Sequence, residues 1–201
     1  MMLQTPLGAT LPIPFNGKVH RHERSFLQLN CDGVSKLPSV VPSYRVHFVP
    51  WAERYLEDMA HLVSAAYRGH IDSEINDQYR SIPGARQFLT NIIRYPGCGR
   101  FSPHSSLLAI DGQTGKVCGM CLASQISATS GHVTQLCILP ALRHVRLGYE
   151  LLRQSILRLK HDGCDTVSLT VTCANVEALR LYRSVGFRGL ATFPALVWER
   201  V

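Results

Sequence analysis

The chain has 201 residues, of which 46% are hydrophobic and 17% charged, a composition typical of one well-packed globular domain. Its hydrophobic runs are too short to cross a bilayer and no segment has the pattern of an export signal, so we expect a cytoplasmic protein without a membrane partner. The formal net charge of +7 favours anionic partners, but the basic residues form no block and are not interleaved with aromatic residues, which argues against nucleic acid.

Residues 1–43 contain many prolines and little periodicity, which predicts an irregular extension that wraps around or pairs with a domain over residues 44–201. Within that domain, periodicity and turn residues predict the following order: a strand at 44–49, a helix at 51–67, a polar loop or broken helix at 69–80, a helix at 83–95, strands at 106–110, 117–126 and 132–139, a helix at 147–161, a strand at 166–172, a short helix ending near residues 185–187, and a final strand at 195–199. This order predicts a mixed α/β fold with a partly antiparallel sheet.

The seven cysteines are scattered without the spacing of a disulfide framework, which predicts buried free thiols. The one close pair, Cys118 and Cys121, falls in a predicted strand, where residues three positions apart point to opposite faces. We therefore expect no metal site. Cys137 and Cys173 have no neighbouring histidine or aspartate to activate them, which favours packing over nucleophilic roles.

The segment 138–152 contains the end of an apolar strand, a short basic turn and the start of a helix. Because the first amides of a helix lack intrahelical partners and its dipole is positive there, a diphosphate could bind the amides of residues 145–149 with help from Arg143 and Arg146. Gly148 would allow close backbone approach. The alternative is a solvated basic turn, with Gly148 present only for helix packing.

A second pattern spaces Asn175, Ala178, Tyr182, Gly186 and Phe187 along the predicted short helix. Asn175 suits the N-cap of that helix, which does not exclude contact with a ligand. Tyr182 alone would be a core aromatic residue with its hydroxyl bonded to the backbone.

Together these two segments, separated by one helix and one strand, resemble the signatures of GNAT-superfamily acyl-CoA-dependent N-acetyltransferases. Arg143 and Gly148 match the ends of the acyl-CoA signature, while His144 and Arg146 replace usual glycines, and the second segment matches its hallmark at every position. The resemblance covers residues 44–201. It implies a central, mostly antiparallel, splayed sheet flanked by helices, acetyl-CoA as co-substrate, an amine as acceptor, and an acetyltransferase that could be a homodimer.

The resemblance also assigns roles to individual residues. Tyr182 corresponds to the general acid, and strand amides near Cys137 and Ile138 correspond to the groups that hold the pantetheine arm and polarise the thioester carbonyl. The implied cofactor-binding residues are Cys137, Ile138, Arg143, His144, Val145, Arg146, Leu147, Gly148, Tyr149 and Asn175.

The general base is not specified by the sequence. Gln135 stands where many family members have a glutamate, and an amide cannot accept the proton at neutral pH. Water could relay the proton, or His132, Asp72 or Glu74 could take it. Gln135 and Arg146 also motivate an alternative function, a non-catalytic CoA-binding or regulatory module with the same fold.

Overall fold

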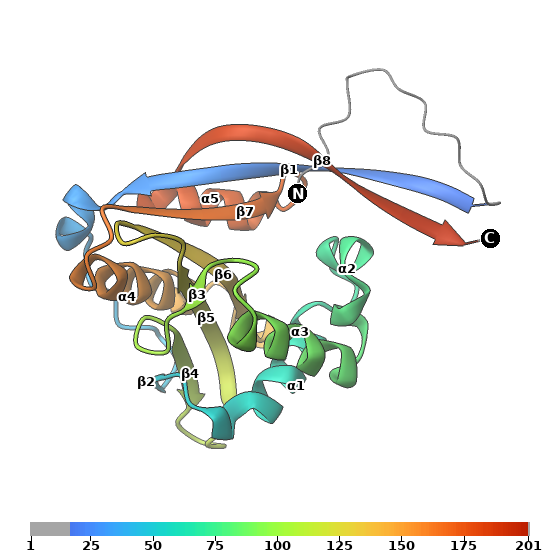
Figure 1. The fold of residues 1–201 in the computed structure, drawn as a ribbon. Coiled ribbons are helices and arrows are strands. Elements are labelled where there is room, and N and C mark those ends of the chain that lie inside the picture. Colours follow the sequence, from blue (N-terminus) through green and yellow to red (C-terminus); the bar gives the residue numbers. More distant parts are fainter. Residues whose placement is uncertain (1–16, 201) are drawn as a thin grey trace.

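The computed structural model describes residues 17–200, and its strands form a single eight-stranded sheet (Figure 1). The neighbour order is β2-β4-β5-β6-β7-β1-β8, with the short β3 paired to β5. The strands are β1 (Gly17–Asn30), β2 (Val46–Pro50), β3 (Arg100–Phe101), β4 (Leu107–Asp111), β5 (Val117–Gln125), β6 (Ser130–Ile138), β7 (Thr166–Thr172) and β8 (Arg188–Arg200). Of the pairs in the described part of the chain, only β6 and β7 run parallel, which confirms the predicted mostly antiparallel sheet.

Helices cover both faces of this sheet. They are α1 (Leu56–Ala66), α2 (Asp72–Ile75), α3 (Ile82–Arg94), α4 (Leu147–His161) and α5 (Val176–Val185), with short 3-10 turns at Cys31–Lys36, Glu53–Tyr55, Asp77–Arg80 and Pro140–Leu142. None of the helices within residues 17–200 is long and apolar enough to span a membrane.

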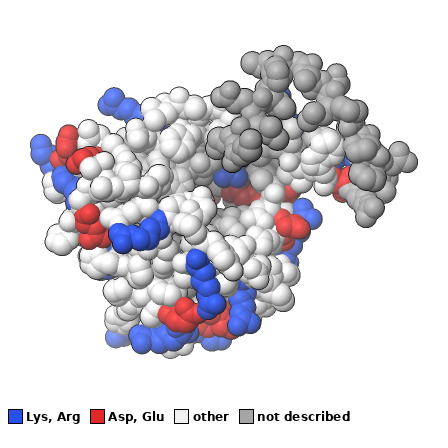
Figure 2. Space-filling view, in the orientation of Figure 1, with Lys and Arg blue, Asp and Glu red and all other residues white. Residues whose placement is uncertain are grey.

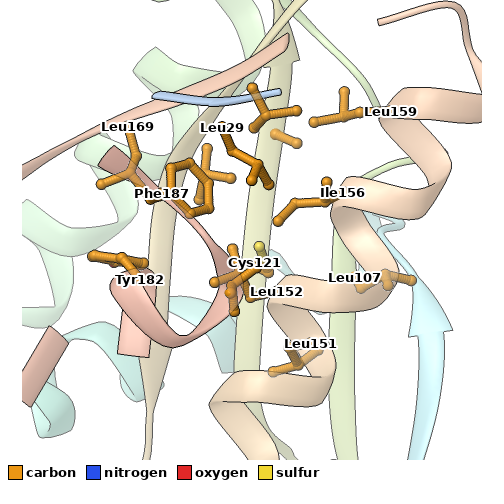
Figure 3. Packing of buried hydrophobic residues seen from close by; sticks show 14 of the residues in the cluster. Leu29, Leu107, Cys121, Leu151, Leu152, Ile156, Leu159, Leu169, Tyr182 and Phe187 are labelled. Carbon is orange, nitrogen blue, oxygen red and sulfur yellow. The ribbon is translucent and has the colours of Figure 1, made fainter. Parts of the chain in front are cut away.

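Two buried clusters hold the layers together. The first lies between the sheet and α4 with α5, and Figure 3 shows Leu152 and Ile156 of α4 pointing toward sheet residues such as Cys121. The second joins α1 and α3 to the other face around Met59, Leu89 and Met120. Each buried side chain of this size stabilises the fold by roughly 1.5–3 kcal/mol relative to an exposed one.

Several local signals place the elements where the sequence predicts them. The predicted bounds of α4 and β7 are confirmed. Asn175 caps α5 by accepting a hydrogen bond from the Ala178 amide at 3.2 Å, and Gly186 ends that helix with a φ of 107°. Ser81 caps α3 by accepting from the Gly84 amide, and Pro83 lies in the first turn.

The prediction that residues 1–43 form an irregular extension is wrong for Gly17–Asn30. These residues form β1, which pairs with β7 through Arg24–Asn30 and with β8 through most of its length. The final strand is correspondingly longer than predicted. Residues 1–16 of the predicted extension lie outside the described residues.

The prediction that Cys118 and Cys121 point to opposite faces is also wrong. Ala109 pairs with Gly119 and Ile110 with Val117, so Cys118 is the extra residue of a bulge. This shift breaks the alternation of the strand, and both cysteines contribute to the first buried cluster. In residues 17–200 no group of three or more histidine, cysteine or acidic side chains is arranged to hold a metal ion.

The sheet splays between β6 and β7. Their pairing covers only Ser130–Val133 opposite Thr166–Leu169, although both strands continue beyond it. A bulge lies at the divergence, because Ala123 pairs with Val133 and Leu122 with Gln135, which leaves Thr134 unpaired. Bulges bend the strand that contains them. The backbone edge of β6 from residue 134 to residue 138 therefore faces a gap instead of a neighbouring strand.

Candidate functional site

The first cavity opens along the free edge of β6 and has a volume of about 640 Å³. The turn before α4, the end of α1 and the length of α5 form its walls. Tyr182 and all the predicted cofactor-binding residues except Val145 line it. The side chain of Val145 packs against the first buried cluster instead, because the turn directs it toward the core.

The turn before α4 has an uncommon backbone conformation. His144 and Arg146 have φ values of 66° and 63°, in the left-handed region that favours glycine. These are the two positions at which the sequence replaces usual glycines. Within the described part of the chain, no group accepts a hydrogen bond from the amides of residues 144–149. The turn thus presents several free N–H groups at the positive end of α4, beside a cavity.

The strain at Arg146 predicts a stabilising substitution. We expect Arg146→Gly to raise the unfolding free energy by about 0.5–1 kcal/mol, because relief of the left-handed backbone exceeds the entropy that glycine adds to the unfolded chain. Urea denaturation of the purified variant would measure this change. The matched control is Arg180→Gly, which removes an exposed arginine from the right-handed helix α5 and should lower stability by about 1 kcal/mol. A loss of stability in both variants would contradict the predicted strain.

Arg143 connects the turn to α1. Its Nη2 donates to the Ala66 carbonyl at 3.0 Å, and Ala66 is the last residue of α1. The final carbonyls of a helix lack intrahelical partners, and a cation is favourable at that end. Arg143 therefore positions the turn through this bond while it also lines the cavity.

Gly148 has space around it within the protein. A Cβ atom built there would meet Ile138 and Leu181 side-chain atoms at 3.6 Å, which is ordinary van der Waals contact. Helix packing alone therefore does not require a glycine at this position. A side chain at residue 148 would instead occupy part of the first cavity.

A second, polar cavity of about 360 Å³ adjoins the first. Tyr67, Leu136, Asn175, Ala178 and Tyr182 line both cavities, so the two meet at the point where β6 and β7 diverge. The basic turn borders the first cavity, and residues of β1, α2 and β7 border the second. A reaction between two ligands, one in each cavity, would take place at these shared residues.

Tyr182 is buried, with 8% of its surface exposed, and it belongs to α5. Burial raises the pKa of its hydroxyl well above the usual value. None of the described residues forms a hydrogen bond with that hydroxyl. The alternative interpretation, a core aromatic residue whose hydroxyl is bonded to the backbone, therefore lacks its hydrogen bond in this part of the chain. The group remains protonated at neutral pH and faces both cavities.

A polar network places a carboxylate beside Tyr182. Asp72, at the start of α2, accepts hydrogen bonds from the Thr172 hydroxyl and, at 3.4 Å, from Nδ2 of Asn175. Its Oδ2 lies 3.5 Å from Nδ1 of His70, and Asn175 also approaches Nε2 of His70 at 3.5 Å. Asp72 lines the second cavity and His70 the first. The network provides a proton acceptor that is hydrogen-bonded to Asn175, one of the residues at the junction of the two cavities.

The other candidate bases have different surroundings. Gln135 is buried, donates to the Tyr67 hydroxyl at 2.6 Å and accepts from the Tyr79 hydroxyl at 3.4 Å, which fixes it against two stacked rings. The imidazole of His132 is hydrogen-bonded to Ser168 and lines neither cavity. Glu74 is exposed on α2 and lines neither cavity.

Among the residues that line these cavities, Arg24, Tyr67, His70 and Tyr79 had no functional role assigned from the sequence. The many polar side chains of residues 69–80, directly after a predicted amphipathic helix, were a signal that could have identified His70 and Tyr79 as site residues. Arg24 gave no signal, since its strand was not predicted.

Comparison with protein-family models matches residues 72–187 to the acetyltransferase (GNAT) family. The matched segment begins at Asp72 and includes the strained turn, α4 and α5. No curated protein matches the sequence.

Solved structures share the fold at low sequence identity. A GCN5-related N-acetyltransferase from Sphaerobacter thermophilus has a TM-score of 0.61 and 16% identity, over 91% of this chain and 52% of that one. A GNAT-family protein from Novosphingobium aromaticivorans has a TM-score of 0.58 and 19% identity, over 96% and 70%. A chain of the NatC complex bound to Gag peptide and CoA has a TM-score of 0.56 and 17% identity, over 78% and 99%. The chain spans about half the length of the Sphaerobacter protein, and at these identities the likeness establishes the fold alone.

Proposed function

Because the chain belongs to the GNAT acetyltransferase family, we propose that it transfers an acetyl group from acetyl-CoA directly to an amine. The observation that carries the proposal is the meeting of two cavities at Tyr182, one of them bordered by free helix amides and the other by a carboxylate. The first cavity suits the co-substrate, and the second suits the acceptor.

The shape and charge of the first cavity support acetyl-CoA. The free amides at the start of α4, with Arg146 beside them, match a diphosphate. The unpaired edge of β6 offers alternating amides and carbonyls to an extended pantetheine arm, in the manner of an added strand. A chain of the NatC complex, which has this fold, belongs to a complex that holds CoA.

The reaction requires a neutral nucleophile, a stabilised oxyanion and a proton for the leaving thiolate. We assign Asp72 to remove a proton from the acceptor ammonium group. The neutral nitrogen attacks the thioester carbon, and a β6 amide near Ile138 stabilises the oxyanion. The carbon–sulfur bond breaks, Tyr182 protonates the thiolate, and the surplus proton on nitrogen restores Tyr182.

Calorimetric titration with acetyl-CoA, followed by an assay of thiol release with a panel of amines, tests this proposal. We expect saturable binding to one site and thiol release that depends on the amine. Binding without transfer to any amine would favour the non-catalytic CoA-binding module, and the absence of binding by the folded protein would refute the assignment of the first cavity.

The role of Tyr182 can be tested separately. Tyr182→Phe is expected to lower kcat by about 100-fold or more, while the affinity for acetyl-CoA changes by less than about twofold. Since burial raises the pKa of Tyr182, the wild-type rate should show no loss caused by this group between pH 7 and about pH 10. Tyr95→Phe is the control, because Tyr95 is 62% exposed. Unchanged turnover in Tyr182→Phe would remove this residue from the mechanism.

A further inference from the structure

We propose that the acceptor is a small amine that also carries a carboxylate, such as an amino acid, and that Arg24 binds this carboxylate. The inference rests on the proposed transfer reaction, since it names the class of molecule that occupies the second cavity. It depends on three observations: the place of Arg24, the lack of partners for its guanidinium, and the charge balance of the cavity.

Arg24 reaches the second cavity from β1. It pairs with Thr172 of β7 on one side and with Phe193 of β8 on the other, and its side chain lines the cavity. Cross-strand partners project from the same face of a sheet. The Thr172 hydroxyl donates a hydrogen bond to Asp72, so the Arg24 guanidinium and the proposed base lie on the same side of the sheet.

The guanidinium of Arg24 has too few hydrogen-bond partners. It carries five N–H donors, yet its one hydrogen bond to a described residue runs from Nη2 to the Thr170 carbonyl at 3.5 Å. Its Nε is buried and has no hydrogen-bond partner among the described residues. Arg24 also forms no ion pair with any of these residues. Arg153, by contrast, is bonded to Glu150 at 2.6 Å. A buried, unpaired donor is unfavourable, and a carboxylate can accept from Nε and a neighbouring N–H together.

The charges of the second cavity suit a molecule with both signs of charge. Apart from tyrosines, the ionisable side chains that line it are Arg24 and Asp72. Figure 2 shows basic and acidic side chains next to one another beside a hollow in the middle of this face. An ammonium group is complementary to Asp72 and a carboxylate to Arg24. The cavity volume of about 360 Å³ is near the lower end for small-molecule sites, which fits an acceptor of amino-acid size.

Arg24 also acts on the proposed acid. Burial raises the pKa of Tyr182, and the positive charge of Arg24 opposes that increase, as it does at Tyr79. The guanidinium is therefore within electrostatic range of the reacting groups. A carboxylate held there would place an amine on the same small molecule near the junction of the two cavities.

The test compares the twenty common L-amino acids with their carboxamides as acceptors, using thiol release by the wild type, Arg24→Gln and Arg24→Lys. Calorimetric titration with acetyl-CoA accompanies each variant. We expect the wild type to prefer the acids over the amides by about 50-fold or more, and Arg24→Gln to lose this preference with unchanged acetyl-CoA affinity. Arg24→Lys should retain part of it. Arg21→Gln is the control, because Arg21 is an exposed arginine on the same strand.

The outcomes separate the two proposals. Equal use of acids and amides by the wild type, or an acid preference that persists in Arg24→Gln, would overturn the role of Arg24 and leave the transfer reaction intact. The absence of acetyl-CoA binding, or of transfer to any acceptor, would overturn the proposed function and this inference with it. If Arg24→Gln fails to fold, an acid preference in folded Arg24→Lys that is clearly smaller than that of the wild type supports the inference, and full wild-type preference there overturns it.

Discussion

Gly148→Glu is expected to weaken acetyl-CoA binding by about 100-fold or more while the protein stays folded. The new carboxylate would project into the first cavity at the start of α4, where we place the diphosphate. Repulsion between like charges about 4 Å apart amounts to roughly 4 kcal/mol at an effective dielectric constant of 20, which exceeds the free energy of a hundredfold change in affinity. Calorimetric titration with acetyl-CoA measures the effect.

Two variants separate charge from loss of structure. Gly148→Ala adds only a Cβ at ordinary contact distance, so it should fold normally and weaken binding less than glutamate does. Gly97→Glu introduces the same charge at an exposed glycine with no atom within 4 Å of the new Cβ, and its affinity should equal that of the wild type. Wild-type affinity in Gly148→Glu would place the co-substrate elsewhere.

Asp72→Asn is expected to lower kcat by about 10²–10⁴-fold with little change in acetyl-CoA affinity. Asparagine can keep the hydrogen bond from the Thr172 hydroxyl, but it cannot take a proton from the acceptor. The remaining activity should increase with pH, since more of the acceptor amine is then neutral. Initial rates measured across pH with a fixed acceptor test both expectations.

Glu74→Gln provides the matched control for Asp72→Asn. Glu74 lies on the same short helix, is exposed and lines neither cavity, so its replacement should leave kcat unchanged. If Asp72→Asn retained the wild-type rate at every pH, a relay through water or another group would have to replace Asp72 in the mechanism.

The elements that the sequence predicts best are those with purely local signals. The apolar periodicity of α4, the alternation of β7 and the cap of α5 at Asn175 depend on neighbours within a few positions. The positive φ values of His144 and Arg146 agree with the family resemblance, which marks these positions as usual glycines.

β1 could not be predicted in the same way, because few of its residues contact the core. Leu27 and Leu29 are buried, but the part before Arg24 extends beyond β7 and pairs with β8 alone. Arg24 itself faces a cavity, so a position that would be apolar in a purely structural strand is charged. Arg24 therefore interrupts the alternation of apolar and polar residues that would have indicated a strand, at the position that we propose to belong to the site.

The candidate base depends on contacts between distant segments. Thr172 and Asp72 are 100 positions apart in the chain, and only the folded sheet brings α2 against β7. The sequence named Asp72 among several candidates, and no local pattern distinguished it from Glu74. The structure distinguishes them by exposure and by the hydrogen bonds that Asp72 accepts.

The position of β1 between β7 and β8 has a consequence for the order of folding. His20 and Glu199, which are hydrogen-bonded across this strand pair, are 179 positions apart. During synthesis at the ribosome, β1 emerges long before either of its partner strands, and contacts of such long range form slowly because a large loop must close. We expect the newly made chain to form α1, α3 and the β4–β6 hairpins first. Until β7 and β8 are made, β1 has no partner strand and is a segment that chaperones can bind.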